Sequence, residues 1–436
     1  KHYFVLTPMD DHLAFTCAFT STAPSTQPVT VAQTQEEAKN YWNSFWKEGA
    51  AVDFSACTDP RAKELERRVV LSQYLLAIQS AGTIPPQETG LTYNSWFGKF
   101  HLEMIWWHEA QFALWNRSNL LDRTLGWYEK VEPIARQIAQ RQGFDGVRWM
   151  KMTDPSGTEA PSKVGSFLIW QQPHLIYLAE LLYRADPTKE VLEKYNRLVQ
   201  ETAEFMYSFA TYDELEGRYV LKSAIPAQET LRAAETINPP FELSYWHFAM
   251  QTAQQWRERM GQQRSLEWDE MIDKLSPLAS NNEGLYLAAE TAIDTYKDIR
   301  YTSDHMAVLG AVGILPMNKL IREDYMKNTL HWIWDNWNWG KTWGWDYPMT
   351  AMNAARLGEP EKVVGALLMD KRTNTYLPNG HNYQDGRLRI YLPGNGGLLT
   401  AIAMMCAGWD GCTEINPGFP KDGTWNVRWE GLKPLP

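Results

Sequence analysis

The sequence predicts a mainly α protein, an (α/α)6 barrel of six helical hairpins with short β-strands at the N- and C-terminal ends. From Asp59 nearly to the end of the chain the hydrophobic periodicity is helical, and it divides into twelve segments. No strand alternates with these segments, which excludes an enzyme built on a parallel sheet. The segments have no repeat of fixed length, which argues against an open solenoid and favours hairpins closed into a ring.

The chain divides into four predicted regions. Residues 1–32 alternate in short apolar runs that are typical of strands. Residues 33–58 contain one linker helix, Gln33 to Gly49, and 59–412 form the barrel. The tail, 413–436, indicates a short strand followed by coil.

Each barrel helix is expected from a periodic apolar run with a recognisable start. Asp59-Pro60 and Asp186-Pro187 precede two such runs, and proline suits a first helical turn because its missing N–H has no partner to lose there. The predicted helices are 61–80, 101–116, 119–142, 165–184, 188–211, 240–260, 265–277, 301–313, 320–337, 346–357, 359–369 and 394–408.

Charge and composition exclude several classes of function. The formal net charge of −10 argues against nucleic acid as a partner, which needs a concentrated basic face. No run of about 18 apolar residues is present, so we expect no membrane span. Of the four cysteines only Cys406 and Cys412 are close enough in sequence to bridge. None has metal-ligand spacing, so we expect neither a metal nor another cofactor.

The aromatic content points to a carbohydrate ligand. The chain has 21 Trp and 20 Tyr, many of them beside Asn, Asp, Gln and Glu, as in HWIWDNWNWGKTWGWDYP. Flat apolar faces mixed with hydrogen-bonding groups suit a sugar, whose C–H face stacks while its hydroxyls bond. A tryptophan-rich core is the alternative explanation for any single Trp.

The segment Leu221–Met250 is the strongest candidate for catalysis. It carries three carboxylates, Glu229, Glu235 and Glu242, in an irregular stretch broken by prolines ahead of a long helix. Acids at such a helix start face unpaired N–H groups and are candidates for proton transfer. Capping or solvation is the alternative, and Glu242 in particular fits a first-turn cap.

Long connections lead into every second predicted helix, and in a barrel they gather at one end. Each of them carries a polar residue, so we expect these residues around one pocket: Glu103, Glu159, Glu229, Asp304, Asp346 and Asn395. Among them, Asp304 is expected to be structural. His108 and His247 are expected to pack on helix faces.

The order of these segments resembles (α/α)6 glycoside hydrolases of families 65 and 95, over nearly the whole chain. RWMKMTDPSGTEAP followed by FLIWQQPHLIYLAELLYR resembles the family 65 run that lines the sugar pocket. PAQE followed by INPPFELSYW resembles the family 65 segment that carries the general acid, which implies that role for Glu229. LPGNGGLLTAIAMM resembles the family 95 ending. The resemblance also implies that 1–32 is the remnant or edge of an N-terminal β-sandwich, a domain otherwise absent from this chain.

Two departures from these families bear on the reaction. Trp345-Asp346 stands where family 65 has phosphate-binding serines, and a carboxylate there would repel phosphate. Pro393 stands where family 95 has its basic Asp. We therefore expect hydrolysis of an oligosaccharide with inversion, with Glu229 as general acid and Asp346 as general base. The expected substrate-binding residues are Glu103, Glu159, Trp170, His174, Glu235, Glu242, Trp345 and Asn395.

Other functions on the same barrel stay open. Glu235 and Glu242 are rivals of Glu229 for the acid role. A sugar epimerase would need paired histidines, and the nine His are scattered. A polysaccharide lyase would need a His/Tyr pair, for which Tyr301, Tyr391 and His305 are available. A glycan-binding protein would not need two carboxylates. Activity on glycans suggests a secreted or periplasmic location by association.

Overall fold

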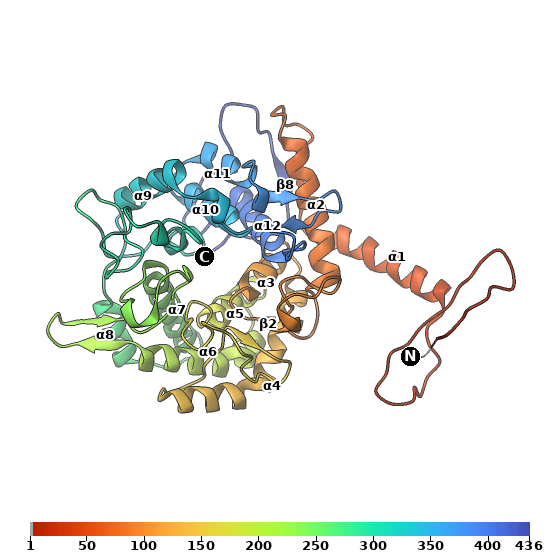
Figure 1. Cartoon of the computed structure of the whole chain (residues 1–436), viewed down its shortest axis with the longest axis horizontal. Helices are drawn as coiled ribbons and strands as arrows, with labels where there is room; N and C mark the ends of the chain where they lie inside the picture. The colour runs from red at the N-terminus through yellow and green to blue at the C-terminus, as the bar shows by residue number, and fades with distance from the viewer. Residues whose placement is uncertain (1–2) are drawn as a thin grey trace.

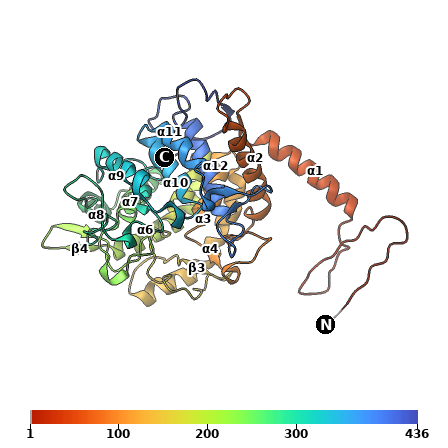
Figure 2. The same cartoon turned by 45° about the horizontal axis from the view of Figure 1, so that its top comes forward.

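The computed structural model describes residues 3–436, which contain twelve α-helices and only short strands (Figure 1). Helix α1 (Val31–Glu48) and the segment before it extend away from the body formed by the other helices (Figures 1 and 2). Among the described residues, no helix combines the length and the apolar character needed to cross a membrane.

Six inner elements close into a ring, as the sequence predicts. They are α3 (Ile105–Leu114), α5 (His174–Ala185), α7 (Pro240–Arg259), the 3-10 segment η4 (Ala307–Ala311), α10 (Asp346–Arg356) and α12 (Leu392–Ala407). Each contacts the next, and α12 contacts α3, which completes the (α/α)6 barrel. Every residue of α3 is buried, because its sequence IWWHEAQFAL is apolar around most of its circumference.

Six outer helices alternate with the inner elements. They are α2 (Ala62–Gln79), α4 (Ser118–Gln142), α6 (Lys189–Phe209), α8 (Leu266–Lys274), α9 (Glu323–Asn336) and α11 (Pro360–Leu367). These helices are amphipathic, and α6 buries Leu192, Tyr195 and Val199 on one face while charged residues cover the other.

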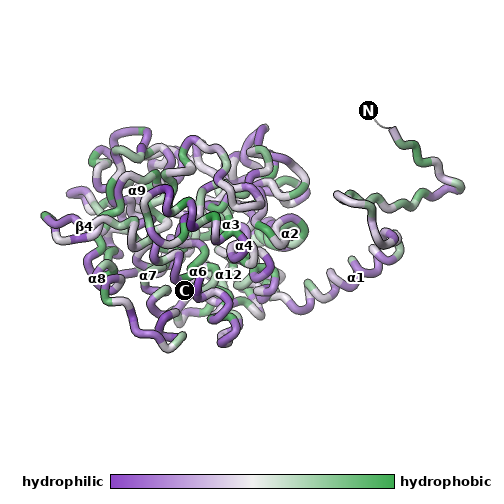
Figure 3. The backbone as a smooth tube through the Cα atoms, turned by 90° about the horizontal axis from the view of Figure 1, so that it is seen from below, coloured by the Kyte–Doolittle hydropathy of each residue, from purple (hydrophilic) through white to green (hydrophobic). Residues whose placement is uncertain are grey.

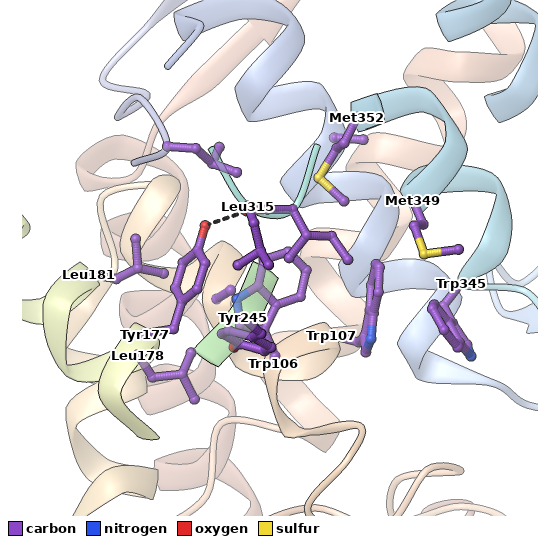
Figure 4. Close-up of a cluster of buried hydrophobic side chains, with 14 of the residues drawn as sticks. Trp106, Trp107, Tyr177, Leu178, Leu181, Tyr245, Leu315, Trp345, Met349 and Met352 are labelled. Carbon is purple, nitrogen blue, oxygen red and sulfur yellow. Dashed lines mark hydrogen bonds between the residues drawn. The ribbon is translucent and has the colours of Figure 1, made fainter. Parts of the chain in front are cut away.

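The barrel core is aromatic at its centre. Trp106 and Trp107 of α3 pack against each other with ring centroids 4.9 Å apart, and Trp107 lies 4.9 Å from the Trp345 ring (Figure 4). The close fit depends on glycine in α12. A Cβ on Gly396 would lie 1.8 Å from the carbonyl oxygen of Trp107, so no larger residue fits at this crossing.

Short two-stranded sheets join distant segments. β1 (Ala51–Asp53) pairs with β8 (Arg428–Glu430), so the strand predicted in the tail is present and ties the chain's end to the start of the barrel. β2 (Phe100–His101) pairs with β3 (Met152–Thr153). The other two pairs are β4 (Thr211–Asp213) with β5 (Arg218–Val220), and β6 (Thr375–Tyr376) with β7 (Asn382–Tyr383).

The strand prediction for 1–32 is wrong for the described residues 3–32, and residues 1–2 lie outside the described part. Residues 3–30 contain no strand, because no neighbouring chain segment supplies a ladder. Their apolar side chains are exposed, as for Phe4 and Phe19, which are 88% and 94% exposed. Figure 3 shows hydrophobic stretches of this arm standing clear of the body.

The predicted eighth helix, 301–313, is also wrong. Two 3-10 turns replace it, η3 (Ile299–Tyr301) and η4. Asp304 between them has φ 67° and Gly313 after them has φ 116°, and neither conformation can continue an α-helix. The four cysteines are free, so Cys406 and Cys412 do not bridge.

Candidate active site

A cavity of about 540 Å³ is walled by connections that lead into the inner ring. Four acidic residues line it, Glu88, Glu103, Glu229 and Asp304, and we call it the carboxylate cavity. Its volume is within the usual range for small-ligand sites. Three of these acids belong to the set predicted from the long connections, whereas Glu88 was not predicted.

Pairing of β2 with β3 builds one wall of the cavity. The N–H of Leu102 donates to the carbonyl of Lys151 at 2.8 Å, which sets Glu103 beside Lys151. The Lys151 ammonium lies 3.4 Å from Glu103 and in contact with Glu229. Burial raises the pKa of Glu103 to about 6, although Lys151 and His101 oppose this. Burial alone would lower the pKa of Lys151, but Glu103 and Glu229 outweigh it and keep the amine charged.

Glu88 and His101 form a second pair beside this wall. His101 Nδ1 lies 3.4 Å from Glu88 and 3.6 Å from Glu103. Burial opposes charge on both members, but their mutual attraction outweighs it. The pKa of Glu88 is therefore held below its ordinary value and the pKa of His101 above its own. The indole N–H of Trp96 also donates to Glu88, at 2.6 Å.

Asp304 and His305 form the facing group of charges. The His305 ring lies between two carboxylates, with Nε2 3.7 Å from Asp304 and Nδ1 3.1 Å from Asp346. Burial alone would lower the pKa of His305, but Asp304 and Asp346 raise it to about 9. The ring is therefore an imidazolium at neutral pH. The indole N–H of Trp343 donates to Asp304 at 3.1 Å.

The loop that carries Glu229 is fixed by buried contacts. Glu242 accepts a hydrogen bond from the N–H of Ala227 at 2.6 Å, and Gln228 donates to the carbonyl of Tyr301 at 2.8 Å. Burial raises the pKa of Glu242 to about 7, against the opposing effect of the Ala227 N–H. Glu242 thus holds the loop from behind and does not line the cavity.

Asp346 is fully buried and does not line the carboxylate cavity, which corrects its predicted place at the pocket. It accepts hydrogen bonds from His305 and from the N–H of Trp343, the latter at 2.7 Å. Asp346 begins α10, where the helix dipole and free N–H groups draw a carboxylate inward. Asp346 is hydrogen-bonded to His305, and it is His305 that lines the cavity.

Three further predicted ligands pack beneath the cavity. Trp345 and Trp170 are buried and stack with ring centroids 5.6 Å apart. His174 is also buried, and burial lowers its pKa to about 3. Its neutral ring donates from Nε2 to the carbonyl of Glu103 at 3.0 Å and accepts at Nδ1 from Tyr245. His174 therefore positions Glu103.

The remaining predicted residues lie away from the cavity. Glu159 pairs with Arg141 and lines a separate surface groove of about 670 Å³. Glu235 is exposed and lies 3.5 Å from Arg232. Asn395 is buried and donates to Ser72 at 2.8 Å and to the carbonyl of Gly380 at 2.9 Å, so it joins α12 to its neighbours.

Several cavity residues were missed by sequence reasoning. The largest omissions are Glu88, His101, Lys151 and Trp343, whereas His305 and Tyr391 were considered only for a lyase. Lys151 could have been found, because it opens the KMTDPSG segment in a predicted long connection. Within residues 3–436 no cluster of His, Cys, Asp and Glu has the arrangement of a metal site.

The ring of helical hairpins is an (α/α)6 barrel, and the acid-lined cavity is formed by connections between its helices. No family model and no curated protein matches the chain. Among solved structures, a protein described as a kojibiose phosphorylase from the human microbiome superposes with a TM-score of 0.67 at 11% identity, over 92% of this chain and 63% of that one.

Two other solved structures show the same fold. A glycosidase in complex with glucose gives a TM-score of 0.54 at 11% identity, over 78% of this chain and 97% of that chain. A rhamnosidase from Klebsiella oxytoca with rhamnose bound gives 0.51 at 10% identity, over 80% and 65%. Such low identities establish the fold alone, so the residues of this chain must carry the functional argument.

Proposed function

We propose that this protein is a glycoside hydrolase that cleaves an oligosaccharide with inversion, with Glu229 as general acid and Asp304 as general base. The observation that carries this proposal is the contrast in exposure among the four cavity acids. The side chains of Glu229 and Asp304 are 33% and 20% exposed, whereas those of Glu88 and Glu103 are 6% and 3% exposed. Two accessible carboxylates in one sugar-sized cavity are what acid–base hydrolysis requires.

Asp304 suits the base role because its partly exposed carboxylate faces a cation and a hydrogen-bond donor. The imidazolium of His305 attracts its charge, and the Trp343 indole donates a hydrogen bond to it. Asp304 also has a left-handed backbone, φ 67°, which is uncommon for a residue with a side chain and is typical of functional sites. In an inverting reaction this carboxylate would take a proton from the attacking water.

Glu229 suits the acid role because Lys151 beside it can compensate for the change in its charge. Lys151 contacts both Glu229 and Glu103, so its ammonium can pair with either carboxylate. When Glu229 carries the proton, ionised Glu103 holds the ammonium. After Glu229 gives its proton to the leaving oxygen, Lys151 stabilises the new anion. Glu103 and Lys151 are positioning residues in this scheme.

Asp346 takes a different role from the predicted one. Its carboxylate is fully buried and already accepts from His305 and Trp343, which favours a positioning role over contact with the attacking water. We propose instead that Asp346 keeps His305 protonated and oriented, in the way that a buried acid orients a functional histidine. The imidazolium in turn faces Asp304, with Nε2 3.7 Å from its carboxylate.

The test is a panel of α- and β-linked disaccharides, including fucosides, incubated with and without inorganic phosphate and followed by ¹H NMR. We expect phosphate-independent release of a free sugar whose first-formed anomer is opposite to that of the substrate. A sugar phosphate as product would establish phosphorolysis, the reaction named for one of the structural neighbours. An unsaturated or epimerised product would favour a lyase or an epimerase, and binding without turnover a glycan-binding protein.

A further inference from the structure

Three cations surround the exposed end of the carboxylate cavity: Lys99, Lys163 and Arg387, which we call the cationic rim. Lys163 and Arg387 are exposed and Lys99 is half-buried. Across residues 3–436, none of the three has a carboxylate oxygen within 4.0 Å of its charged nitrogens. Lys151, deeper in the cavity, contrasts with them because two glutamates neutralise it.

The charge of the cationic rim is opposite in sign to the net charge of the whole chain. The formal net charge is −10, and many surface cations lie within 4.0 Å of a carboxylate oxygen, as Arg61, Arg218 and Arg264 do. The four carboxylates of the cavity lie beside His101, Lys151 and His305, so they do not neutralise the three rim cations, which form a local positive field at their own positions. Such a field attracts and orients an anionic ligand, since cavity walls of low dielectric focus it.

Two of the rim cations are held in place by contacts that are not ionic. The Arg387 guanidinium lies 4.9 Å from the centre of the Trp96 ring, and the Trp96 indole is itself anchored to Glu88. Lys99 donates to the carbonyl of Pro161, and its ammonium lies 5.8 Å from the Phe97 ring. These contacts leave the charges of Arg387 and Lys99 available for a ligand.

An exposed aromatic residue adjoins these cations. Trp96, Phe97 and Gly98 have φ values of 51°, 61° and 73°, a left-handed run that is unfavourable for the two aromatic residues. The Phe97 side chain is 92% exposed, and it lines the same cavity. Strained backbone that presents an apolar ring to solvent is a feature of ligand sites, and the ring offers a stacking face for a sugar.

We infer that the cationic rim binds an anionic substituent, a carboxylate, sulfate or phosphate, on the sugar next to the bond that is cleaved. The ring of that sugar would stack on Phe97 while its charged group pairs with Arg387, Lys163 and Lys99. This inference rests on the proposed glycosidase function and narrows its substrate class to acidic glycans.

Binding can be tested without turnover, in the Glu229→Gln variant, by titration calorimetry at low salt. The probes are glucuronate, glucose 6-sulfate and glucose 6-phosphate, with glucose and inorganic phosphate as references. We expect at least one charged sugar to bind about tenfold tighter than glucose and than phosphate, because charge-assisted hydrogen bonds add to stacking. Whichever charged sugar binds best identifies the substituent.

The variants R387Q and K163Q should each reduce that preference severalfold, and the triple variant that adds K99Q should abolish it. Arg389→Gln is the matched control, since Arg389 is exposed, lies two residues from Arg387 and does not line the cavity. Raising the salt to 1 M should weaken binding of the charged sugar where the rim is intact and in R389Q but not in the triple variant.

Equal affinity for glucose and all charged sugars would overturn the inference, as would a preference that survives in the triple variant. Binding of inorganic phosphate as tight as that of glucose 6-phosphate would also overturn it, because the rim would then be a simple phosphate site. These outcomes are independent of catalysis. Failure of the proposed hydrolysis would instead be seen as absent turnover in the disaccharide panel.

Discussion

His305 donates from Nδ1 to both carboxylate oxygens of Asp346, at 3.1 and 3.2 Å, and so separates that buried acid from the carboxylate cavity. The other ring nitrogen lies 3.7 Å from Asp304, which does line the cavity. The three residues form a line of alternating charge, acid, imidazolium and acid. This arrangement transfers the proposed base role from Asp346 to Asp304.

Loss of either proposed catalytic acid should remove most of the activity. We expect Glu229→Gln and Asp304→Asn to lower kcat by about 10²- to 10⁴-fold on a cleaved glycoside, because each removes one proton-transfer group. Glu235→Gln, on an exposed residue near Glu229 in sequence, should keep wild-type turnover. Activity of D304N within a factor of two of wild type would rule out Asp304 as the base.

Asp346→Asn should make His305 easier to deprotonate. The wild-type ring, with its pKa raised to about 9 by its two carboxylates against the effect of burial, should titrate near that value in ¹H–¹⁵N NMR. Removing one carboxylate should lower this pKa by about one unit or more. An unchanged titration in D346N would contradict the proposed role of Asp346.

The raised pKa of His305 also predicts how the stability of the folded chain depends on pH. A raised pKa in the folded chain means that the His305 pairing stabilises it fully below pH 6.5 and that this contribution is lost as pH rises through about 9. Urea unfolding should therefore show a larger difference between wild type and D346N at pH 6 than at pH 9.5. A difference that grows with pH would have the wrong sign.

Glu242→Gln should stabilise the protein at alkaline pH. Burial raises the pKa of this carboxyl from 4.5 to about 7, so its ionisation costs the folded chain up to about 3 kcal/mol once the pH exceeds 7. Below pH 4.5 the carboxyl is protonated in both states and this cost is absent; the cost is complete once the pH has risen through 7. Relative to wild type, E242Q should gain that amount between pH 5 and pH 8 in chemical unfolding, and no gain would contradict the burial argument.

Gly396→Ala should destabilise the barrel. Its Cβ would lie 1.8 Å from a backbone oxygen of α3, so α12 and α3 must separate, at a cost of about 3 kcal/mol. Gly126→Ala is the matched control in another helix, since its Cβ meets nothing within 4 Å. G126A should gain about 0.5–1 kcal/mol from helix propensity. Equal melting temperatures for the two variants would contradict the packing account.

Sequence reasoning predicted most helices because their periodicity is local. Eleven of the twelve barrel helices are present among the described residues, and the missing one, 301–313, contains Asp304 and Gly313 in conformations that only the packed turn requires. The predicted N-terminal strands are absent from residues 3–30 for a related reason. An alternating pattern specifies a strand only where a partner is in reach, and residues 3–30 have none.

By itself the sequence determined the helical class, the acidic net charge and the loops on which Glu103, Glu229 and Asp304 lie, because periodicity and composition are properties of short segments. Only the tertiary structure decided which acids meet solvent. Asp346 is buried and Asp304 is accessible because His305, Trp343 and the start of α10 pack around the former. The burial of a side chain depends on neighbours from other hairpins, and the local sequence pattern does not specify those neighbours.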